Sequence, residues 1–297
     1  MEMEKLKNKR LLYFLKFFVS LTILYFIFRK IDFKQFYCNF FNISLITILI
    51  LLVTTIIKLV TQIFNWGIYL RMWPNYKFNL TEIIRTHFIG SALRFLLPGG
   101  HATLGKVFFV ENKKSSTFIS IGVEKFFQIW INLLAASIAA CFYFQNLHII
   151  LKFSMVILMV FLPFLVKLFS KIVKREIVKN FFYEYGKIIY RIIFSQIIFV
   201  LLTILQYYVV LNNFQTIELN KVMIGVPLVL FANVIPITIS GLGLRESFSI
   251  KVFAGFAILT DVAVTTSLTI FIFNSVLPGL VGLYFIIKKP RTEKARG

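Results

Sequence analysis

Two segments of the chain combine cations with proline and glycine inside apolar surroundings, and this pattern is suited to binding an anion. In the first segment, Arg94 comes before Pro98-Gly99-Gly100 and Lys106 comes after it. Proline and glycine end one half-helix and let another begin, and the N-terminus of a half-helix exposes free N–H groups and a positive dipole. The alternative is a surface loop whose cations extend to the interface. The candidate binding residues here are Arg94, Pro98, Gly99, Gly100, His101 and Lys106.

The second segment has the same order of proline, glycine and cation. Glu246 lies near the expected start of the new half-helix, where the dipole favours an acid, whereas Arg245 is electrostatically disfavoured there. Arg245 therefore needs a partner, and a phosphate is the anion that its planar guanidinium fits best. The alternative is that carbonyl groups of the preceding half-helix accept its hydrogen bonds. The candidate residues are Pro236, Ser240, Gly241, Gly243, Arg245 and Glu246.

Three further polar residues lie at membrane depth. Glu124 is one of few acids there, and we expect it either to pair with a cation of the broken segments or to lie at the interface. Lys58 lies well inside an apolar stretch and is expected to face a cavity. Asn274, shortly before Pro278-Gly279, is expected to break the last helix or to hydrogen-bond a neighbouring helix.

The sequence has no pattern that indicates a metal, a cofactor or catalysis. Its three histidines, His87, His101 and His148, are far apart and have no clustered cysteine or acid to complete a zinc site. We find no P-loop, dinucleotide fingerprint, nucleophile elbow or zinc-protease motif. We therefore expect a protein that is not an enzyme and has no metal, cofactor or catalytic residue.

These candidate residues are embedded in a chain of 297 residues that is 59% hydrophobic and only 15% charged, with a mean hydropathy of +0.84. A soluble domain has about 25% charged residues and cannot bury this much apolar surface in one core. The composition excludes a soluble enzyme, a disordered chain and, with two cysteines, a disulfide scaffold. It predicts an all-α polytopic membrane protein.

The apolar stretches predict six full transmembrane helices and two broken segments. Each broken segment contains the proline and glycine residues described above and is expected to return to the side from which it enters. The full spans are expected over residues 11–28, 43–70, 117–144, 148–170, 191–211 and 261–287, and the broken hairpins over residues 80–110 and 221–259.

The lysines and arginines of the loops are distributed unevenly. Sixteen lie in the loops of one side and four in the loops of the other. The positive-inside rule places the basic side, and hence both termini, in the cytoplasm. Contact with anionic lipid then explains the net charge of +21, and no nucleic-acid partner is expected. The loops of the basic side are residues 1–10, 167–191 and 288–297.

Residues 167–191 also carry apolar side chains at helical spacing between their cations. This pattern indicates either an amphipathic helix on the membrane surface or a transmembrane helix that extends beyond the bilayer.

The order of the segments divides one membrane domain, residues 1–297, into two halves. Residues 1–144 and residues 145–297 each read as span, span, broken hairpin and span. The second half starts on the opposite side of the membrane, so we expect it to be inverted relative to the first. Inverted repeats with matched interruptions are typical of transporters that bind their substrate near the midplane.

Together these motifs resemble the flippase-like family typified by the transmembrane region of lysylphosphatidylglycerol synthases. The resemblance covers nearly the whole chain, and its most specific part is the segment Gly241-Leu-Gly-Leu-Arg-Glu246. It implies a multi-pass protein of the bacterial cytoplasmic membrane that handles a lipid. The other motifs that carry it are Pro98-Gly-Gly, Lys106, Glu124-Lys125, Pro236, Asn274 and Pro278.

The chain departs from the family pattern at three positions. Lys106 and Lys125 stand where the family tends to have arginine, which weakens bidentate recognition of a head group, and His101 stands where an acid is common. The larger synthases add a soluble aminoacyl-transfer domain. We expect no such domain here and therefore no synthase activity.

We expect a lipid flippase or transporter that binds an anionic phospholipid or a polyprenyl-phosphate-linked lipid through the cations of the two broken segments. Two other interpretations stay open. One is a membrane-embedded transferase that uses a lipid-phosphate donor, which would need an acid or base beside the cations. The other is a non-transporting assembly subunit that binds partner proteins of envelope biosynthesis.

Overall fold

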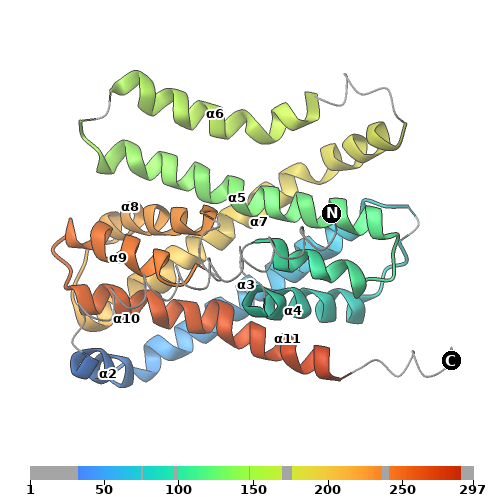
Figure 1. Cartoon of the computed structure of the whole chain (residues 1–297). Helices are drawn as coiled ribbons and strands as arrows, with labels where there is room; N and C mark the ends of the chain where they lie inside the picture. Colours follow the sequence, from blue (N-terminus) through green and yellow to red (C-terminus); the bar gives the residue numbers. More distant parts are fainter. Residues whose placement is uncertain are drawn as a thin grey trace, which may run out of the picture.

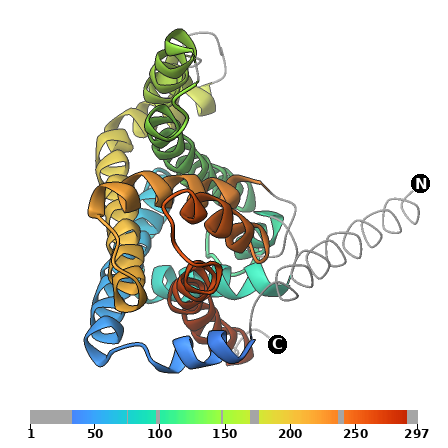
Figure 2. The same cartoon turned by 90° about the vertical axis from the view of Figure 1, so that its left-hand side faces the viewer.

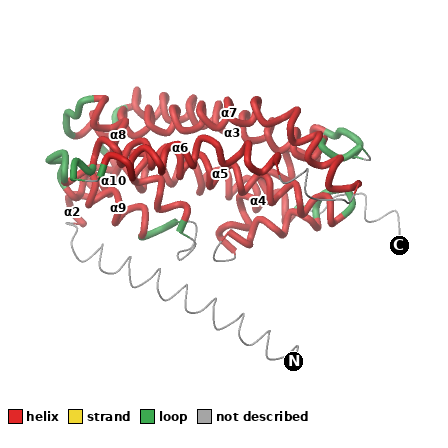
Figure 3. Tube along the Cα trace, turned by 90° about the horizontal axis from the view of Figure 1, so that it is seen from above, coloured by secondary structure: helices red, strands yellow, loops and turns green. Residues whose placement is uncertain are grey.

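The structure is a computed structural model that describes residues 33–74, 76–96, 100–146, 148–168, 176–235 and 241–288. These residues form helices and contain no strand, as the tube in Figure 3 shows. For this part of the chain the prediction of an all-α protein is confirmed. The first predicted span, residues 11–28, lies outside the described residues. The first described helix, α2 (Phe33–Phe41), packs against the start of the last long helix.

Four helices of the described chain are long and apolar enough to cross a membrane. Their surfaces carry many exposed apolar side chains; Leu45, Ile46 and Phe64 of α3, for example, are 60–71% exposed. A continuous apolar surface of this kind indicates contact with lipid. The four helices are α3 (Leu45–Arg71), α5 (Lys114–Tyr143), α7 (Glu176–Phe214) and the continuous run of α10 (Thr260–Phe271), η4 (Ile272–Val276) and α11 (Leu277–Ile287).

Three of the predicted spans correspond closely to α3, α5 and the α10–α11 run. The span predicted over residues 148–170 forms α6 (Ile149–Leu168), whose apolar part is shorter than the four long helices. In Figure 1, α6 lies along α5 at the edge of the molecule, away from α10 and α11. The indole N–H of Trp130 in α5 donates to the carbonyl of Met159 at 2.6 Å and links the two helices.

Helix α7 begins at Glu176, which is 15 residues before the start of the span that the sequence predicted over residues 191–211. From Glu176 onward the basic, amphipathic stretch is continuous with the transmembrane helix, which agrees with the second of the two interpretations given for it. Its apolar stripe covers protein: Tyr185 is 1% exposed, stacks on Phe127 and donates to the carbonyl of Pro163 at 3.1 Å. Residues 169–175 lie outside the described part.

The two broken segments enter the helix bundle from opposite ends (Figure 1). In the first, α4 (Leu80–Leu96) is followed by η1 (Gly100–Phe108). In the second, α8 (Leu219–Leu230) continues into η3 (Phe231–Val234) and is followed by α9 (Leu244–Ala254). Helix α9 packs against α8 and α10, and Figure 2 shows it between these two helices. Arg245 and Glu246 at the start of α9 are buried, so the second half-helix begins against protein, where irregular backbone is tolerated in a membrane.

The break before α9 depends on two glycines. Gly241 has φ +83° and Gly243 has φ +87°, which is the left-handed region that other residues adopt at a steric cost. The turn they form lets the N–H of Arg245 donate to the carbonyl of Gly241 at 3.1 Å and start α9. The Gly-Leu-Gly sequence thus fixes the position at which the second half-helix begins.

Helices α4 and α11 pack with their backbones in close contact. A Cβ added to Gly282 of α11 would overlap the carbonyl of Phe88 and come within 2.9 Å of Ala92 in α4. Small residues at such positions are typical of helix pairs in membranes, because close backbone approach increases van der Waals contact. This contact fixes the first broken segment against the last transmembrane helix.

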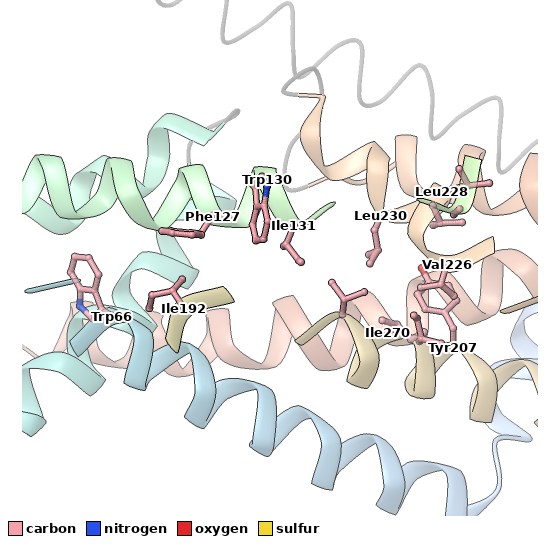
Figure 4. Packing of buried hydrophobic residues seen from close by; sticks show 14 of the residues in the cluster. Trp66, Phe127, Trp130, Ile131, Ile192, Tyr207, Val226, Leu228, Leu230 and Ile270 are labelled. Carbon is pink, nitrogen blue, oxygen red and sulfur yellow. The ribbon is translucent and has the colours of Figure 1, made fainter. Parts of the chain in front are cut away.

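Aromatic side chains fill the space between α3, α5 and α7 (Figure 4). Trp66 and Phe127 are fully buried, and Trp130 is 2% exposed. The ring of Phe127 lies 6.4 Å from that of Tyr69 and 5.9 Å from that of Tyr185, and both pairs are stacked. The same hydrophobic cluster continues to Leu230 and Ile270, which Figure 4 also labels. Leu230 and Ile270 are also lining residues of the cavity described next.

Candidate functional site

The inner ends of both broken segments meet the long helices around a cavity of about 280 Å³. Arg94 of α4, Asn233 of η3 and Arg245 of α9 line it together with residues of α3, α5, α7 and the last helix. Sites for small molecules usually measure roughly 300–1,000 Å³. The cavity therefore has room for one small polar group.

Four cations line this cavity: Lys58, Arg94, Lys125 and Arg245. Among the described residues no carboxylate lines it. Lys58 is 3% exposed and Arg245 is 9% exposed, so two of the four charges are almost entirely buried. Buried cations without an anionic partner are costly at membrane depth, and an anion in the cavity would compensate them.

Arg245 is held at the start of α9 by its neighbours on the second broken segment. Its Nη2 donates to Oδ1 of Asn233 at 2.8 Å, and its guanidinium lies 5.6 Å from the centre of the Phe271 ring. A side chain on Gly241 would come within 3.4 Å of the same guanidinium. Its Nε is buried and has no hydrogen-bond partner in the described structure. The side chain is thus oriented by a neutral acceptor and keeps donors for a ligand.

Lys58 is held by a network of neutral groups that joins three helices. Its Nζ donates to Oγ1 of Thr203 at 2.7 Å and to Oε1 of Gln206 at 3.0 Å, both in α7. The same Gln206 oxygen accepts from Nδ2 of Asn274 at 2.7 Å. Asn274 lies in η4, a stretch of π-helix, which is a feature that often marks functional sites in helices. Two of the three ammonium donors of Lys58 are therefore used, and its charge has no counter-ion among these partners.

Lys125 presents its charge from α5 beside two carboxamides. Its Nζ donates to Oε1 of Gln128 at 3.1 Å. Asn132, which also lines the cavity, has a buried Oδ1 without a hydrogen-bond partner in the described structure. The Nε of Arg94 is buried and unpartnered in the same way. Buried polar atoms usually have partners, so these atoms indicate that a polar ligand belongs in the cavity.

Lys106 and Glu124 form a separate buried ion pair and do not line the cavity. Nζ of Lys106 lies 2.8 Å from Oε2 and 3.1 Å from Oε1 of Glu124. The ammonium also lies 4.2 Å from the centre of the Trp66 ring. The pair compensates its own charges and connects η1 to α5.

Glu246 also has a structural partner. Its Oε2 accepts from the N–H of Gly243 at 2.6 Å, and its Oε1 accepts from Ser267 at 3.0 Å. The first contact satisfies a free N–H at the start of α9, as the third residue of a capping box does, and the negative charge is favourable at that end of the dipole.

The cavity brings together some of the residues predicted from the sequence and not others. Arg94, Gly241, Arg245 and Asn274 line it, whereas Lys106, Glu124, Gly243 and Glu246 do not. Gly100 begins η1, and His101 follows it in that helix, but the described structure does not include the His101 side chain. Pro98, Gly99, Pro236 and Ser240 lie outside the described residues.

Several lining residues on the long helices were missing from the predicted site. Lys125, Gln128 and Asn132 lie three and four residues apart on α5, which places them on one helix face. Gln62 lies four residues after Lys58 on α3, and of these two only Lys58 was expected from the sequence to face a cavity. Polar residues at helical spacing within an otherwise apolar span were the available signal. Gln196 and Thr203 of α7 complete the polar wall.

A site of this composition can bind an anion by charge and by hydrogen bonds from neutral groups. A search of curated proteins found none that matches the chain. One protein family does match: the family described as the lysylphosphatidylglycerol synthase TM region corresponds to residues 13–282. The match covers nearly the whole chain, includes every residue of the cavity and agrees with the four apolar helices long enough to cross a membrane. The chain therefore belongs to the lysylphosphatidylglycerol synthase TM region family, and its function is related to membrane lipids.

Proposed function

We propose that this protein is a lipid flippase that binds the anionic head group of a phospholipid or of a polyprenyl-phosphate-linked lipid in the cavity between its two broken segments. The observation that carries the proposal is the set of four cations that line the cavity, Lys58, Arg94, Lys125 and Arg245, with no carboxylate among the described lining residues. Guanidinium groups fit phosphate oxygens well, and a phosphate in the cavity would compensate charges that are costly to bury.

The surface of α5 supports a lipid as the bearer of this anion. Phe118, Gly122 and Ile129 are exposed and lie along one stripe of the helix, and Ile129 also lines the cavity. Part of the stripe borders an apolar groove of about 270 Å³ that includes Phe181 and Tyr185. A head group in the cavity would therefore have an apolar path beside it for an acyl or prenyl chain.

The arrangement of the broken segments supports movement between the two membrane leaflets. They enter the bundle from opposite ends and contribute Arg94 and Arg245 to the same cavity. We propose that the two halves, residues 1–144 and 145–297, are an inverted repeat that opens the cavity to each side in turn. We further propose six full spans in the bacterial cytoplasmic membrane with both termini in the cytoplasm, as the distribution of basic loop residues predicts.

The contacts of the buried acids favour transport over transferase chemistry. Among the described residues the buried acids are Glu124 and Glu246. Glu124 is paired with Lys106, and Glu246 accepts hydrogen bonds from Gly243 and Ser267. A general base must reach the proton that it removes, and these two carboxylates are held by structural partners. We therefore propose that the protein is not an enzyme.

The proposal is tested by the lipids that remain bound to gently purified protein and by lipid movement in proteoliposomes. In the wild-type protein, mass spectrometry should find one anionic lipid enriched over its share of the membrane. The double variant Arg94→Gln and Arg245→Gln should lose this enrichment. The same variant should move a fluorescent analogue of that lipid between leaflets more slowly.

Lys251→Gln is the matched control, because Lys251 lies on α9 with Arg245 but is exposed. It removes one positive charge from α9 outside the cavity and should behave like the wild type. If the double variant keeps the same lipids and the same transport rate, the cations are structural and the flippase proposal fails. Complex formation that depends on Arg245 without any change in lipid distribution would favour the assembly-subunit interpretation.

A further inference from the structure

The charge balance of the cavity indicates which kind of phosphate it binds. Each of three lining cations is oriented by a neutral oxygen: Lys58 by Thr203 and Gln206, Lys125 by Gln128, and Arg245 by Asn233. These contacts fix the positions of the cations but leave their charges uncompensated. A neutral acceptor is thus present where a structural ion pair would have a carboxylate.

The buried acids are not available as counter-ions. Among the described residues they are Glu124 and Glu246. Glu124 lies against Lys106, and Glu246 accepts from Gly243 and from Ser267. Neither carboxylate lines the cavity. The four lining cations therefore face the cavity without an anion from the described protein.

A singly charged phosphodiester would compensate only one of these four charges. A phosphomonoester carries close to two negative charges at neutral pH and presents three acceptor oxygens, and a diphosphate carries more charge. The four cations come from four different helices and line one cavity. A group with several acceptor oxygens can accept hydrogen bonds from more than one of them.

Unused donors in the cavity match these additional oxygens. The Nε atoms of Arg94 and Arg245 are buried and have no partner in the described structure. Lys58 has one ammonium N–H beyond the two that Thr203 and Gln206 accept. Charge-assisted hydrogen bonds from these groups become stronger as the negative charge of the phosphate rises.

We propose that the cavity selects a lipid whose phosphate group carries two or more negative charges, a phosphomonoester or a diphosphate, over lipids with a singly charged phosphodiester. This inference rests on the proposed function, because it concerns the ligand of the same site.

The test compares short-chain phosphatidic acid, a phosphomonoester, with short-chain phosphatidylglycerol, a phosphodiester, by titration into the purified full-length protein in detergent. We expect phosphatidic acid to bind about tenfold more tightly at about pH 8, where its phosphate is doubly charged. The preference should largely disappear at about pH 5, where the monoester carries about one charge. Inorganic phosphate and pyrophosphate are titrated separately as head groups without a chain and should bind much more weakly than phosphatidic acid.

Variants link the preference to the cavity. Lys125→Gln should reduce the preference for phosphatidic acid over phosphatidylglycerol, whereas Lys125→Arg should retain it because the charge stays in place. Lys251→Gln, which removes an exposed charge from α9, should leave it unchanged.

The outcomes separate this inference from the proposed function. Equal binding of the two lipids at about pH 8 would overturn the selection for a multiply charged phosphate but leave an anionic-lipid site in place. Binding of neither lipid would contradict the proposed function itself. Inorganic phosphate or pyrophosphate that binds as tightly as phosphatidic acid would show a site for the free anion and overturn the inference of a lipid ligand.

Discussion

The ammonium group of Lys106 lies 2.8 Å from the carboxylate of Glu124, and the two side chains are only 1% and 5% exposed. The pair connects η1, the returning part of the first broken segment, to α5. Because the charge of Lys106 is compensated by this contact, it does not add to the charge of the cavity. Lys106 thus anchors the broken segment that carries Arg94 toward the ligand.

Breaking this pair should destabilise the protein strongly. Lys106→Gln and Glu124→Gln should each lower the free energy of unfolding by roughly 3–5 kcal/mol, because each leaves one buried charge without its partner. The double variant Lys106→Met and Glu124→Leu removes both charges and should recover most of that loss. Thermal unfolding of the purified proteins in detergent measures the stability of the two single variants and of the double variant.

The exposed pair of Lys187 and Glu184, at 2.7 Å, is the control for this prediction. Lys187→Gln removes an ion pair of similar length at the surface and should leave the unfolding temperature almost unchanged, because exposed ion pairs contribute little to stability. If Lys106→Gln unfolds at the same temperature as Lys187→Gln, the buried pair does not anchor η1.

Gly90 provides the space through which Lys106 reaches Glu124. A Cβ at this position would overlap the side chain of Lys106 at Cε. Gly90→Ala should therefore displace the ammonium group and destabilise the protein, although alanine favours a helix over glycine by about 1 kcal/mol. Gly122→Ala, where no heavy atom lies within 4 Å of the new Cβ, should be neutral or stabilising in the same unfolding measurement. Equal melting temperatures for the two variants would contradict the steric argument.

The packing of α4 on α11 gives a prediction about the position of the first broken segment. Gly282→Ala would place a methyl group against the backbone carbonyl of Phe88, which cannot move aside as a flexible side chain can. We expect the helices to separate, with a loss of roughly 1–3 kcal/mol in stability and a weaker affinity for anionic lipid, because α4 carries Arg94. Unfolding and lipid titration measure the two effects, with Gly122→Ala as the control for unfolding and Lys251→Gln as the control for lipid titration. Wild-type values in both would show that the contact adapts without cost.

Much of the fold could be predicted from hydropathy and from the residues that break helices. α3 covers Leu45–Arg71 where the sequence predicts residues 43–70, and the turn before α9 has positive φ at both predicted glycines. The start of α7 could not be predicted, because apolar length indicates where a helix crosses the membrane and not where it begins. Tyr185 and its neighbours form an amphipathic stripe whether they cover lipid or protein, and here they cover protein.

The site was harder to predict, because the direction of each side chain depends on how its helix is rotated. Glu124 and Lys125 are adjacent, and their side chains point about 100° apart on α5. Glu124 pairs with Lys106 and does not line the cavity, whereas Lys125 lines it. The sequence shows that both charges lie near membrane depth but does not give the rotation. The pairing of Lys58 with Thr203 and Gln206 spans about 145 residues and depends entirely on how α3 packs on α7.

Gln206 provides a way to separate the charge of the cavity from the stability of the fold. Its Oε1 accepts from Lys58 at 3.0 Å and from Asn274 at 2.7 Å. Gln206→Leu removes this acceptor, leaves the cavity charge unchanged and should lower stability by roughly 1–3 kcal/mol, because Lys58 and Asn274 lose a buried partner. Gln206→Glu keeps the shape and gives Lys58 a carboxylate as counter-ion.

The two variants should therefore affect binding and stability in opposite ways. Gln206→Glu should bind anionic lipid about tenfold more weakly, because the carboxylate compensates a charge that the ligand otherwise compensates. It should unfold at a higher temperature than Gln206→Leu, because it keeps an acceptor for Lys58 and Asn274. Gln206→Leu should unfold earlier while the folded fraction retains most of its affinity. Lipid titration gives the affinity of each variant for anionic lipid, and thermal unfolding gives its unfolding temperature. If Gln206→Glu binds anionic lipid as tightly as the wild type, Lys58 does not contribute its charge to the ligand, and the binding site is restricted to Arg94, Lys125 and Arg245.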